Sequence, residues 1–467
     1  MAVDIIDRLE AVVGAAHVLR SRASLVSYAV DATVGYRGEP LAAVFPGTAE
    51  ETASVLQLAR EIGITVVGRG AGTSLSAGAV PPKGSIVVSL SGLRSGPYID
   101  REDLTVRAGA GVTTLEVQSA AKAAGLFYPP DPSSQDVTTM GGNAATNAGG
   151  PHALKYGVTR HYLTSLEVAD CSGSVVTYNR GTAGEMMVDL MIGSEGTLGL
   201  VTEVQARLVP APEGFHTVTA TFHSAQTAAQ ATVDLLDTGV IPGKLEFMDD
   251  VSIRAVQAAR DRGLSLEIGA LLLIELHGDR ESLSRDGAVT LESLRDSGAE
   301  NVQEAVSGVE QRRAWEARGA ITSSLAQLKP GKIGEDICVP RTNLPHAVDR
   351  IKKLASERDV LIALFGHIGD GTLHPNVIYE PSSKSETASA RAVLGELARI
   401  GVDSGGVLSG EHGLGLVKRD FVPYAWDWDT IRAMRRLKRE FDPAGVLNPG
   451  IMWPDESERN SDLRDRD

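Results

Sequence analysis

Residues 67–80 read VGRGAGTSLSAGAV, a stretch dense in glycine, serine and threonine that directly follows a predicted strand. Backbone of this composition approaches a diphosphate closely and offers it several N–H groups. The stretch is neither a Walker loop, which needs Gly-Lys-Ser/Thr, nor the G-x-G-x-x-G fingerprint of dinucleotide-binding folds. Taken alone, it fits a phosphate-binding turn and a flexible loop equally well.

Two further glycine-rich stretches follow in the same half of the chain. Residues 128–162 read YPPDPSSQDVTTMGGNAATNAGGPHALKYGVTRHY, and residues 193–204 read GSEGTLGLVTEV. An irregular segment as long as the first of these is usually functional when it lies in a compact domain. Three separated glycine-rich turns favour a chain that wraps around a large, extended cofactor over one that binds a single phosphate.

The pattern of predicted elements indicates two domains. Helices over 1–30, a strand at 41–46, a helix at 49–63 begun by a Thr48–Glu51 capping box and a strand at 64–70 precede a region of short strands that ends near residue 210. Prolines at 210 and 212 mark a joint, beyond which strands and helices alternate. We therefore expect a first domain over 1–212, an α+β domain over 213–420, a C-terminal segment over 421–453 that returns to the first domain, and a disordered tail over 454–467.

Composition limits the classes of function. The chain has 467 residues, 42% of them hydrophobic, and a formal charge of −15, so it offers no basic surface to nucleic acid. Cys171 and Cys338 are predicted to be buried free thiols, which favours a reducing compartment. The acidic N-terminus does not resemble a signal peptide, and the apolar run GALLLIEL at 269–276 is too short to span a bilayer. We expect a cytoplasmic protein, with peripheral attachment to a membrane complex left open.

Residues 365–377, FGHIGDGTLHPNV, place a histidine on each side of an Asp-Gly pair. Asp-Gly at 370–371 between apolar residues predicts a two-residue hairpin turn, in which His367 faces His374 across the ladder. Asn376 then points to the same face of the sheet as His374. Two adjacent imidazoles are good ligands for zinc or another divalent ion, although a lone pair of histidines also fits a hydrogen-bonded turn.

A third ligand is offered by residues 409–420, SGEHGLGLVKRD, in which Glu411 stands beside His412. Two histidines and one carboxylate with an open position are typical of a catalytic metal site. A cation for an anionic substrate is offered by the predicted helix 312–328, where Arg318 and Thr322 share a face. Solvent exposure is the commoner fate of a single arginine. His277 and His346 have no comparable context, and we interpret them as structural or surface residues.

The three glycine-rich stretches, together with GHIGDGTLH and SGEHGLG, resemble the FAD-linked D-2-hydroxy acid dehydrogenases of the vanillyl-alcohol-oxidase (PCMH-type) fold. This family includes flavin D-lactate dehydrogenases, D-2-hydroxyglutarate dehydrogenases and the flavin subunit of glycolate oxidase. The resemblance runs from LAAVFPGTAEE at 41–51 to GVLNPG at 445–450. It implies an α+β fold with an FAD-binding domain and an α+β substrate (cap) domain built on an antiparallel sheet.

The resemblance also implies site residues. FAD would be bound by Arg69, Gly70, Ala71, Gly72, Thr73, Ser74, Pro130, Asp131, Ser134, Gly141, Gly142, Asn143, Asn147, Gly149, Gly150, Val201 and Asn448. Because Thr73 stands where some relatives carry a histidine that attaches the flavin, we expect non-covalent FAD. The metal, Zn or Mn, would be bound by His367, His374 and Glu411. The substrate would be bound by Arg318, Thr322, Lys332, Asn376 and His412, with Lys332 the least secure because loop length varies there among relatives.

The implied reaction is oxidation of a D-2-hydroxy acid of the lactate, glycolate or 2-hydroxyglutarate class to the 2-oxo acid, with hydride transfer to flavin N5 and His412 as the base. The resemblance leaves the electron acceptor open, and an iron–sulfur or membrane partner and a homodimer fit it. Four alternatives stay open: an electron-relay flavin subunit of a glycolate-oxidase-type complex, a redox-neutral alkyl-transfer synthase of the same fold, a metal-dependent hydrolase without FAD, and a nicotinamide-using reductase.

Overall fold

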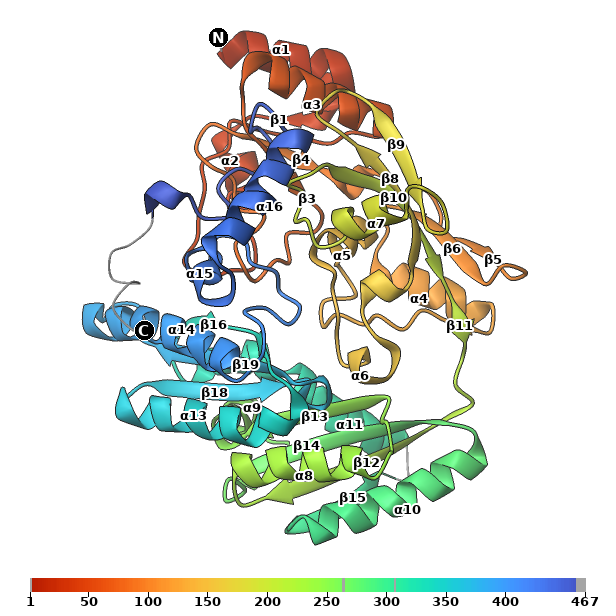
Figure 1. Cartoon of the computed structure of the whole chain (residues 1–467), viewed down its shortest axis with the longest axis vertical. Coiled ribbons are helices and arrows are strands. Elements are labelled where there is room, and N and C mark those ends of the chain that lie inside the picture. Colours follow the sequence, from red (N-terminus) through yellow and green to blue (C-terminus); the bar gives the residue numbers. More distant parts are fainter. Residues whose placement is uncertain (1, 263–264, 306–307, 459–467) are drawn as a thin grey trace. The chain divides into compact units, whose positions relative to one another are not determined.

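The computed structural model describes residues 2–262, 265–305 and 308–458, which divide into two compact units (Figure 1). Unit 1 consists of the described residues of Met1–Ala148, Val158–Pro210 and Glu411–Asp467, and unit 2 of those of Gly149–Gly157 and Ala211–Gly410. We expected domain boundaries after residues 212 and 420, and the two units divide after residues 210 and 410. The passage of Gly149–Gly157 from unit 1 into unit 2 was not predicted.

The first sheet of unit 1 has the strand order β1-β2-β4-β3, in which β2 and β3 run parallel to β4. Its strands are β1 (Val18–Leu19), β2 (Ala42–Val44), β3 (Val66–Arg69) and β4 (Ile86–Ser89). Helix α3 (Ala49–Ile62) connects β2 to β3. Thr48 accepts the N–H of Glu51 as predicted, but the Glu51 carboxylate takes the N–H of Gly47 at 2.7 Å, so the reciprocal half of the capping box is shifted by one residue.

The C-terminal part of unit 1 joins this sheet beside β3. Val66 donates its N–H to Val446 and accepts that of Asn448, both at 2.7 Å. The preceding helix α16 (Trp428–Phe441) holds residues beyond it, because Arg435 pairs with Asp455 and Arg432 with Glu456. The disorder that we predicted from residue 454 is therefore wrong for 454–458, and 459–467 lie outside the described residues.

A second sheet of unit 1 is antiparallel throughout, with the order β5-β6-β10-β8-β9. Its strands are β5 (Tyr98–Asp100), β6 (Thr105–Gly109), β8 (Leu163–Ala169), β9 (Val175–Asn179) and β10 (Leu200–Arg207). Helix α5 (Met140–Thr146) packs beside this sheet, and a Cβ on Gly141 would lie 2.6 Å from that of Ala110. The second glycine-rich stretch thus runs through α5, and the third leads directly into β10.

Unit 2 is built on an antiparallel sheet with the order β15-β12-β14-β13-β18-β19-β16, and β17 (Ile337–Cys338) also pairs with β19 (Figure 1). The other strands are β12 (Gly214–Phe222), β13 (Lys244–Asp249), β14 (Ala270–Gly278), β15 (Asn301–Ala305), β16 (Gly331–Gly334), β18 (Leu361–Gly366) and β19 (Thr372–Tyr379). Within the described residues, this sheet has the antiparallel form that we predicted for the second domain.

Helices cover both faces of the unit 2 sheet. Helices α8 (Ala225–Asp237), α10 (Arg280–Asp296) and α13 (Leu344–Glu357) pack together on one face. Helices α9 (Asp250–Ala259), α11 (Gly308–Gly319) and α12 (Ile321–Ser324) bury apolar side chains against Met248, Leu271 and Leu273 of the other face. Because side chains alternate along a strand, Lys244, Glu246, Glu275 and His277 share that second face. It therefore combines an apolar part with a polar part.

The two-residue hairpin that we predicted at 370–371 is wrong in register. Phe365, and not His367, faces His374 in the ladder, and a short 3-10 turn over Ile368–Asp370 connects the strands. Of the two turn residues only Gly371 has a positive φ, at 89°, whereas a type I′ turn needs positive φ at both positions. The Asp370 carboxylate caps the turn by accepting the N–H of Thr372 at 3.0 Å.

The helix predicted over 312–328 is interrupted. It forms α11 and α12 with Ala320 between them, and Thr322 is exposed whereas Arg318 is buried. The two cysteines are free, as predicted, with Cys171 buried and Cys338 half-buried. Among the described residues, no helix is both long and apolar enough to cross a membrane.

Candidate active site

The first glycine-rich stretch forms a turn with unused backbone donors at the end of β3. Within the described part of the chain, no acceptor takes the N–H groups of residues 70–74. A Cβ on Gly70 would lie 2.4 Å from Thr139 Oγ1, and Gly72 has a φ of 75°. Several consecutive N–H groups in a half-buried turn suit a phosphate, so this segment fits the diphosphate of FAD.

The three glycine-rich stretches meet within unit 1. Thr73 Oγ1 lies 3.5 Å from Thr138 Oγ1, which connects the first stretch to the second. Glu195 donates its N–H to Ala145 at 2.8 Å, which connects the third to the second. Asn448 completes the set, because its side-chain amide donates to the carbonyl oxygens of Gly78 (3.2 Å) and Glu195 (2.6 Å). Residues far apart in the sequence thus form one group of loops.

Several residues expected to bind FAD use their side chains within the protein. Arg69 donates to the carbonyl oxygens of Val30 and Ser27, the Asn143 side chain hydrogen-bonds Thr114 and Thr138, and the side-chain oxygen Oδ1 of Asn147 accepts the backbone N–H of Arg160. Val201 is buried in β10. Pro130, Asp131 and Ser134 lie between β7 (Leu126–Phe127) and α5, whereas Gly149 and Gly150 belong to unit 2. The roles of these residues toward FAD remain predictions.

His367 and His374 lie together in unit 2 despite the different register. Their ring centroids are 5.1 Å apart and the rings are nearly perpendicular. His367 Nδ1 is 2.6 Å from an oxygen of Glu246, whose side chain is completely buried. Extending the pairing of Phe247 with Gly366 by one residue places Glu246 beside His367. A carboxylate on Nδ1 fixes the orientation of the ring, and histidines that bind a metal through Nε2 commonly carry such a carboxylate on Nδ1.

The same carboxylate binds the expected substrate cation. Arg318 Nε is 2.6 Å from the second oxygen of Glu246, and the guanidinium lies over the Phe365 ring at 5.1 Å. Arg318 is 9% exposed, so it is not the solvated surface residue that a single arginine usually is. Glu246 therefore connects an arginine of α11 to a histidine beyond β18.

Lys332 and Asn376 lie on the sheet face that His374 occupies. Lys332 faces Ile378 across the β16–β19 pair, and residues 374, 376 and 378 alternate onto one side. Burial lowers the pKa of the Lys332 ammonium, and the Asn376 amide donates to the carbonyl of His374 at 3.0 Å. The structure thus gathers Arg318, Lys332, His367, His374 and Asn376 in unit 2, whereas Thr322 is exposed.

Glu411 and His412 begin the last segment of unit 1, directly after Gly410. Ser76 Oγ donates to the carbonyl of His412 at 3.0 Å. The next residues are held by Glu195, whose buried carboxylate accepts the N–H groups of Leu414 (2.7 Å) and Gly415 (3.0 Å). Burial raises the pKa of Glu195 to about 7, although these two N–H groups act in the opposite direction. Glu195 therefore fixes the loop that carries the candidate base.

Our sequence interpretation missed Glu246 and Glu195. Glu246 stands in LEFMDD at 245–250 with apolar residues on both sides, and a carboxylate flanked in this way within a predicted strand was an available sign of burial. Glu195 lies in GSEGTLG with a φ of 51°, which is uncommon for a residue other than glycine. No residue pattern around position 195 indicated that backbone conformation.

Two family models match the chain. Residues 40–179 match the FAD binding domain, and residues 211–452 match the C-terminal domain of FAD linked oxidases. The chain belongs to the FAD-linked oxidases. The first match lies within the predicted FAD-binding domain of 1–212, and the second covers both the predicted domain of 213–420 and most of the C-terminal segment of 421–453.

Curated relatives agree with this assignment. Glycolate oxidase subunit GlcD of Bacillus subtilis (strain 168) is 36% identical over 454 residues, which cover 96% of this chain and 97% of that protein. D-lactate dehydrogenase of Anaerostipes hadrus is 31% identical over 89% of this chain and 90% of its own. This FAD-linked oxidase is therefore an oxidoreductase, as predicted, and it is similar to glycolate oxidase subunits and D-lactate dehydrogenases.

Solved structures confirm the predicted fold class. p-Cresol methylhydroxylase with substrate bound superposes with a TM-score of 0.78 at 15% identity, over 96% of both chains. An alkyldihydroxyacetonephosphate synthase superposes with a TM-score of 0.75 at 16% identity, over 96% of this chain and 85% of its own. At these identities the likeness establishes the PCMH-type fold alone.

Proposed function

We propose that this FAD-linked oxidase oxidises a D-2-hydroxy acid of the lactate, glycolate or 2-hydroxyglutarate class to the 2-oxo acid. The observation that supports this most is the Glu246 group, in which one buried carboxylate binds both Arg318 and His367. An anion-binding cation and a fixed imidazole beside a second histidine suit a small acid that carries a hydroxyl next to its carboxylate. The names of the curated relatives support the same substrate class.

In this proposal Arg318 and Lys332 bind the substrate carboxylate. A guanidinium has five N–H donors, so the pairing of Nε with Glu246 leaves the others for a second carboxylate. Thr322 and Asn376 are proposed to bind the hydroxy acid as well.

His367, His374 and Glu411 are the proposed metal ligands. The fit is supported by the Glu246 carboxylate on His367 Nδ1, which selects the tautomer that a ligand histidine needs. A divalent ion such as zinc or manganese, when bound, supplies a Lewis acid that lowers the pKa of a hydroxyl group. Glu246 keeps His367 oriented whether or not the ion is present.

His412 is the proposed base, and it takes the hydroxyl proton as the carbonyl bond forms. Glu195 holds the loop that positions it, through the N–H groups of Leu414 and Gly415. Residues 69–74 and the other predicted FAD residues would bind the flavin without a covalent bond. FAD, when bound, supplies the acceptor for the two electrons and the Cα hydrogen. Because the GlcD relatives are named as subunits, we propose that a partner subunit receives the electrons.

Anaerobic bleaching of the purified yellow protein tests the proposal. A panel of D- and L-2-hydroxy acids is added before and after chelation, to the wild type and to His374→Ala. The matched control is His346→Ala, because His346 is an exposed histidine of the same unit. We expect D-acids to bleach the wild type and the control, and chelation or His374→Ala to abolish bleaching.

The remaining outcomes contradict the proposal in different ways. A yellow protein that no hydroxy acid reduces would indicate an electron-relay subunit or a redox-neutral flavoenzyme. Bleaching that survives both chelation and His374→Ala would show that the reaction does not need the proposed metal. A protein that cannot be loaded with FAD would contradict the proposal that FAD is the cofactor.

A further inference from the structure

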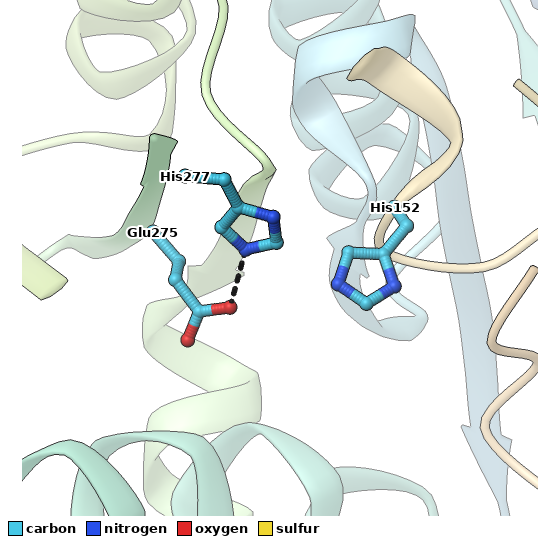
Figure 2. A group of neighbouring side chains, drawn as sticks. All are labelled: His152, Glu275 and His277. Carbon is cyan, nitrogen blue, oxygen red and sulfur yellow. Dashed lines mark hydrogen bonds and ion pairs between the residues drawn. The ribbon is translucent and has the colours of Figure 1, made fainter. Parts of the chain in front are cut away.

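A second cluster of ligand-type side chains lies in unit 2, on the sheet face that Glu246 shares. It consists of His152, Glu275 and His277, all buried (Figure 2). Glu275 and His277 are alternate residues of β14, whereas His152 belongs to the segment Gly149–Gly157 that enters unit 2 from elsewhere in the chain. His277 is among the histidines that we interpreted from sequence as structural or surface residues, and the proposed function uses none of the three.

The three side chains converge. His277 Nε2 is 2.9 Å from Glu275 Oε1, and His152 faces them across a short gap, with its ring centroid 5.3 Å from that of His277 (Figure 2). One ligand atom from each residue lies within 4.8 Å of the other two. With zinc–ligand bonds of 2.0–2.1 Å, two ligand atoms of a tetrahedral site lie about 3.3 Å apart. Movement of the side chains by about 1 Å would therefore bring the three ligand atoms to this spacing.

The surroundings prepare His277 for coordination. Tyr156 Oη is 2.9 Å from His277 Nδ1, which is the outer-shell contact that orients a ligand histidine through its other nitrogen. If Nε2 of His277 bound the metal, the ring proton would reside on Nδ1. The Nδ1–H group would then donate a hydrogen bond to the Tyr156 hydroxyl. Burial lowers the pKa of His277. Burial alone would raise the pKa of Glu275, but the His277 hydrogen bond and the Lys244 charge lower it to about 2.

One feature opposes a cation here. Lys244 Nζ is 3.2 Å from Glu275 Oε1 and lies 4.8 Å from the centre of the Trp315 ring. Its side chain is 20% exposed, so the ammonium is able to turn toward solvent when an ion replaces it as the counter-charge. Lys155 is also near, but its ammonium donates to the carbonyl of His277 at 2.7 Å.

We propose that His152, Glu275 and His277 form a second divalent-metal site, structural in role, which fastens the segment Gly149–Gly157 to β14. Two imidazoles and a carboxylate select a borderline ion such as Zn²⁺ or Co²⁺ over Mg²⁺ or Ca²⁺. A bound ion stabilises the folded chain by an amount that grows with the logarithm of the ratio of free ion concentration to dissociation constant. This site is independent of the proposed function, because none of its ligands belongs to the proposed substrate, flavin or metal residues.

The test counts bound Co²⁺ per chain on the FAD-loaded, chelator-treated protein in the His374→Ala background, where the first site has lost a ligand. Equilibrium dialysis followed by elemental analysis gives the stoichiometry, and thermal unfolding gives the stabilisation. We expect one Co²⁺ per chain, at least about 100-fold weaker binding after a further His277→Gln, and an increase in melting temperature with Co²⁺ that this substitution removes.

Two further variants sharpen the test. His216→Gln is the matched control. His216 lies on the neighbouring strand β12, pairs with Glu304 and packs against Gly287 of α10 on the opposite face of the sheet. The His216→Gln protein should bind Co²⁺ as the parent does. Lys244→Met removes the competing ammonium, so Co²⁺ should bind at least about tenfold more tightly.

The proposal is overturned if the His374→Ala protein binds no Co²⁺, or if His277→Gln leaves its binding unchanged. Either result would show that the cluster is a metal-free hydrogen-bonded network. If His277→Gln does not fold, Glu275→Gln and His152→Gln replace it, and retention of Co²⁺ by both overturns the site equally.

Discussion

The carboxylate of Glu246 connects groups from two different elements, with one oxygen on Arg318 and the other on His367. Removal of one partner from a buried ion pair leaves an uncompensated charge, which typically costs about 3–5 kcal/mol. Where a histidine binds a metal, replacement of the carboxylate on its other nitrogen typically weakens metal binding by about 10- to 100-fold. Under the proposed function both effects would follow from Glu246, which is itself neither a proposed metal ligand nor a proposed substrate residue.

We therefore predict that Glu246→Gln lowers the free energy of unfolding by about 3 kcal/mol and weakens metal binding at least about tenfold, because the amide keeps the shape but not the charge. Chemical denaturation and metal titration measure the two effects. Lys352→Met is the control, since Lys352 pairs with the buried Asp249 elsewhere in the same unit. The Lys352→Met protein should be less stable but should keep its metal affinity. A Glu246→Gln protein with wild-type metal affinity would contradict the role of Glu246.

The turn between β18 and β19 depends on a single glycine. Gly371 has a φ of 89°. A Cβ there would lie 2.1 Å from the carbonyl oxygen of Val339, the residue that follows strand β17. Gly371→Ala should therefore destabilise the protein by about 3 kcal/mol or more, as measured by denaturation, since both the backbone and the neighbouring carbonyl must move. Gly239→Ala is the control, because Gly239 also has a positive φ but nothing within 4 Å of its added Cβ. That variant should lose only about 1 kcal/mol, and equal losses would contradict the close approach at Gly371.

This turn also shows what sequence patterns predict and what they do not. The Asp-Gly pair correctly indicated a turn between two strands and brought two histidines to it, because both are properties of a few adjacent residues. The register was missed because the Asp-Gly pair does not determine it alone: β17, from an earlier part of the chain, pairs with the far edge of β19. The helix 312–328 was likewise predicted from a local pattern, in which Gly319, the last residue of α11, was the available sign of the interruption at Ala320.

The glycine-rich stretches were predictable as one cofactor region because their composition is unusual at three places. The FAD binding domain match over residues 40–179 covers the first two stretches in full and confirms an FAD-binding domain there, whereas residues 193–204 lie beyond it. Glu246 could not be assigned a partner from sequence, because its contact with His367 joins strands separated by more than a hundred residues. The same reason applies to Glu195, whose partners Leu414 and Gly415 lie near the other end of the chain.

For unit 1 as a whole, Glu195 makes stability depend on pH. Its pKa is raised to about 7 in the folded chain from its ordinary value near 4.5, so folding favours the protonated form. This contribution to the free energy of unfolding is complete below about pH 4.5 and is lost as the pH rises through 7. The loss amounts to about 3 kcal/mol. Glu195→Gln should remove this part of the pH dependence, measured as the difference in unfolding free energy between variant and wild type from pH 5 to 8. Glu50→Gln controls for the loss of one exposed carboxylate of the same unit, and a difference that does not vary with pH would contradict the prediction.

The order of the segments along the chain has a consequence for synthesis. Unit 1 needs Val66 paired with Val446 and Asn448, and unit 2 contains residues 149–157, which leave the ribosome well before the rest of that unit. A nascent chain of 210 residues therefore exposes the edge of β3 and the apolar surface that residues 446 and 447 later cover. Since chains grow at about 5–20 residues per second, this exposure lasts tens of seconds. Expression of this protein should accordingly depend on chaperones that bind nascent chains, and slower translation should lower its soluble yield.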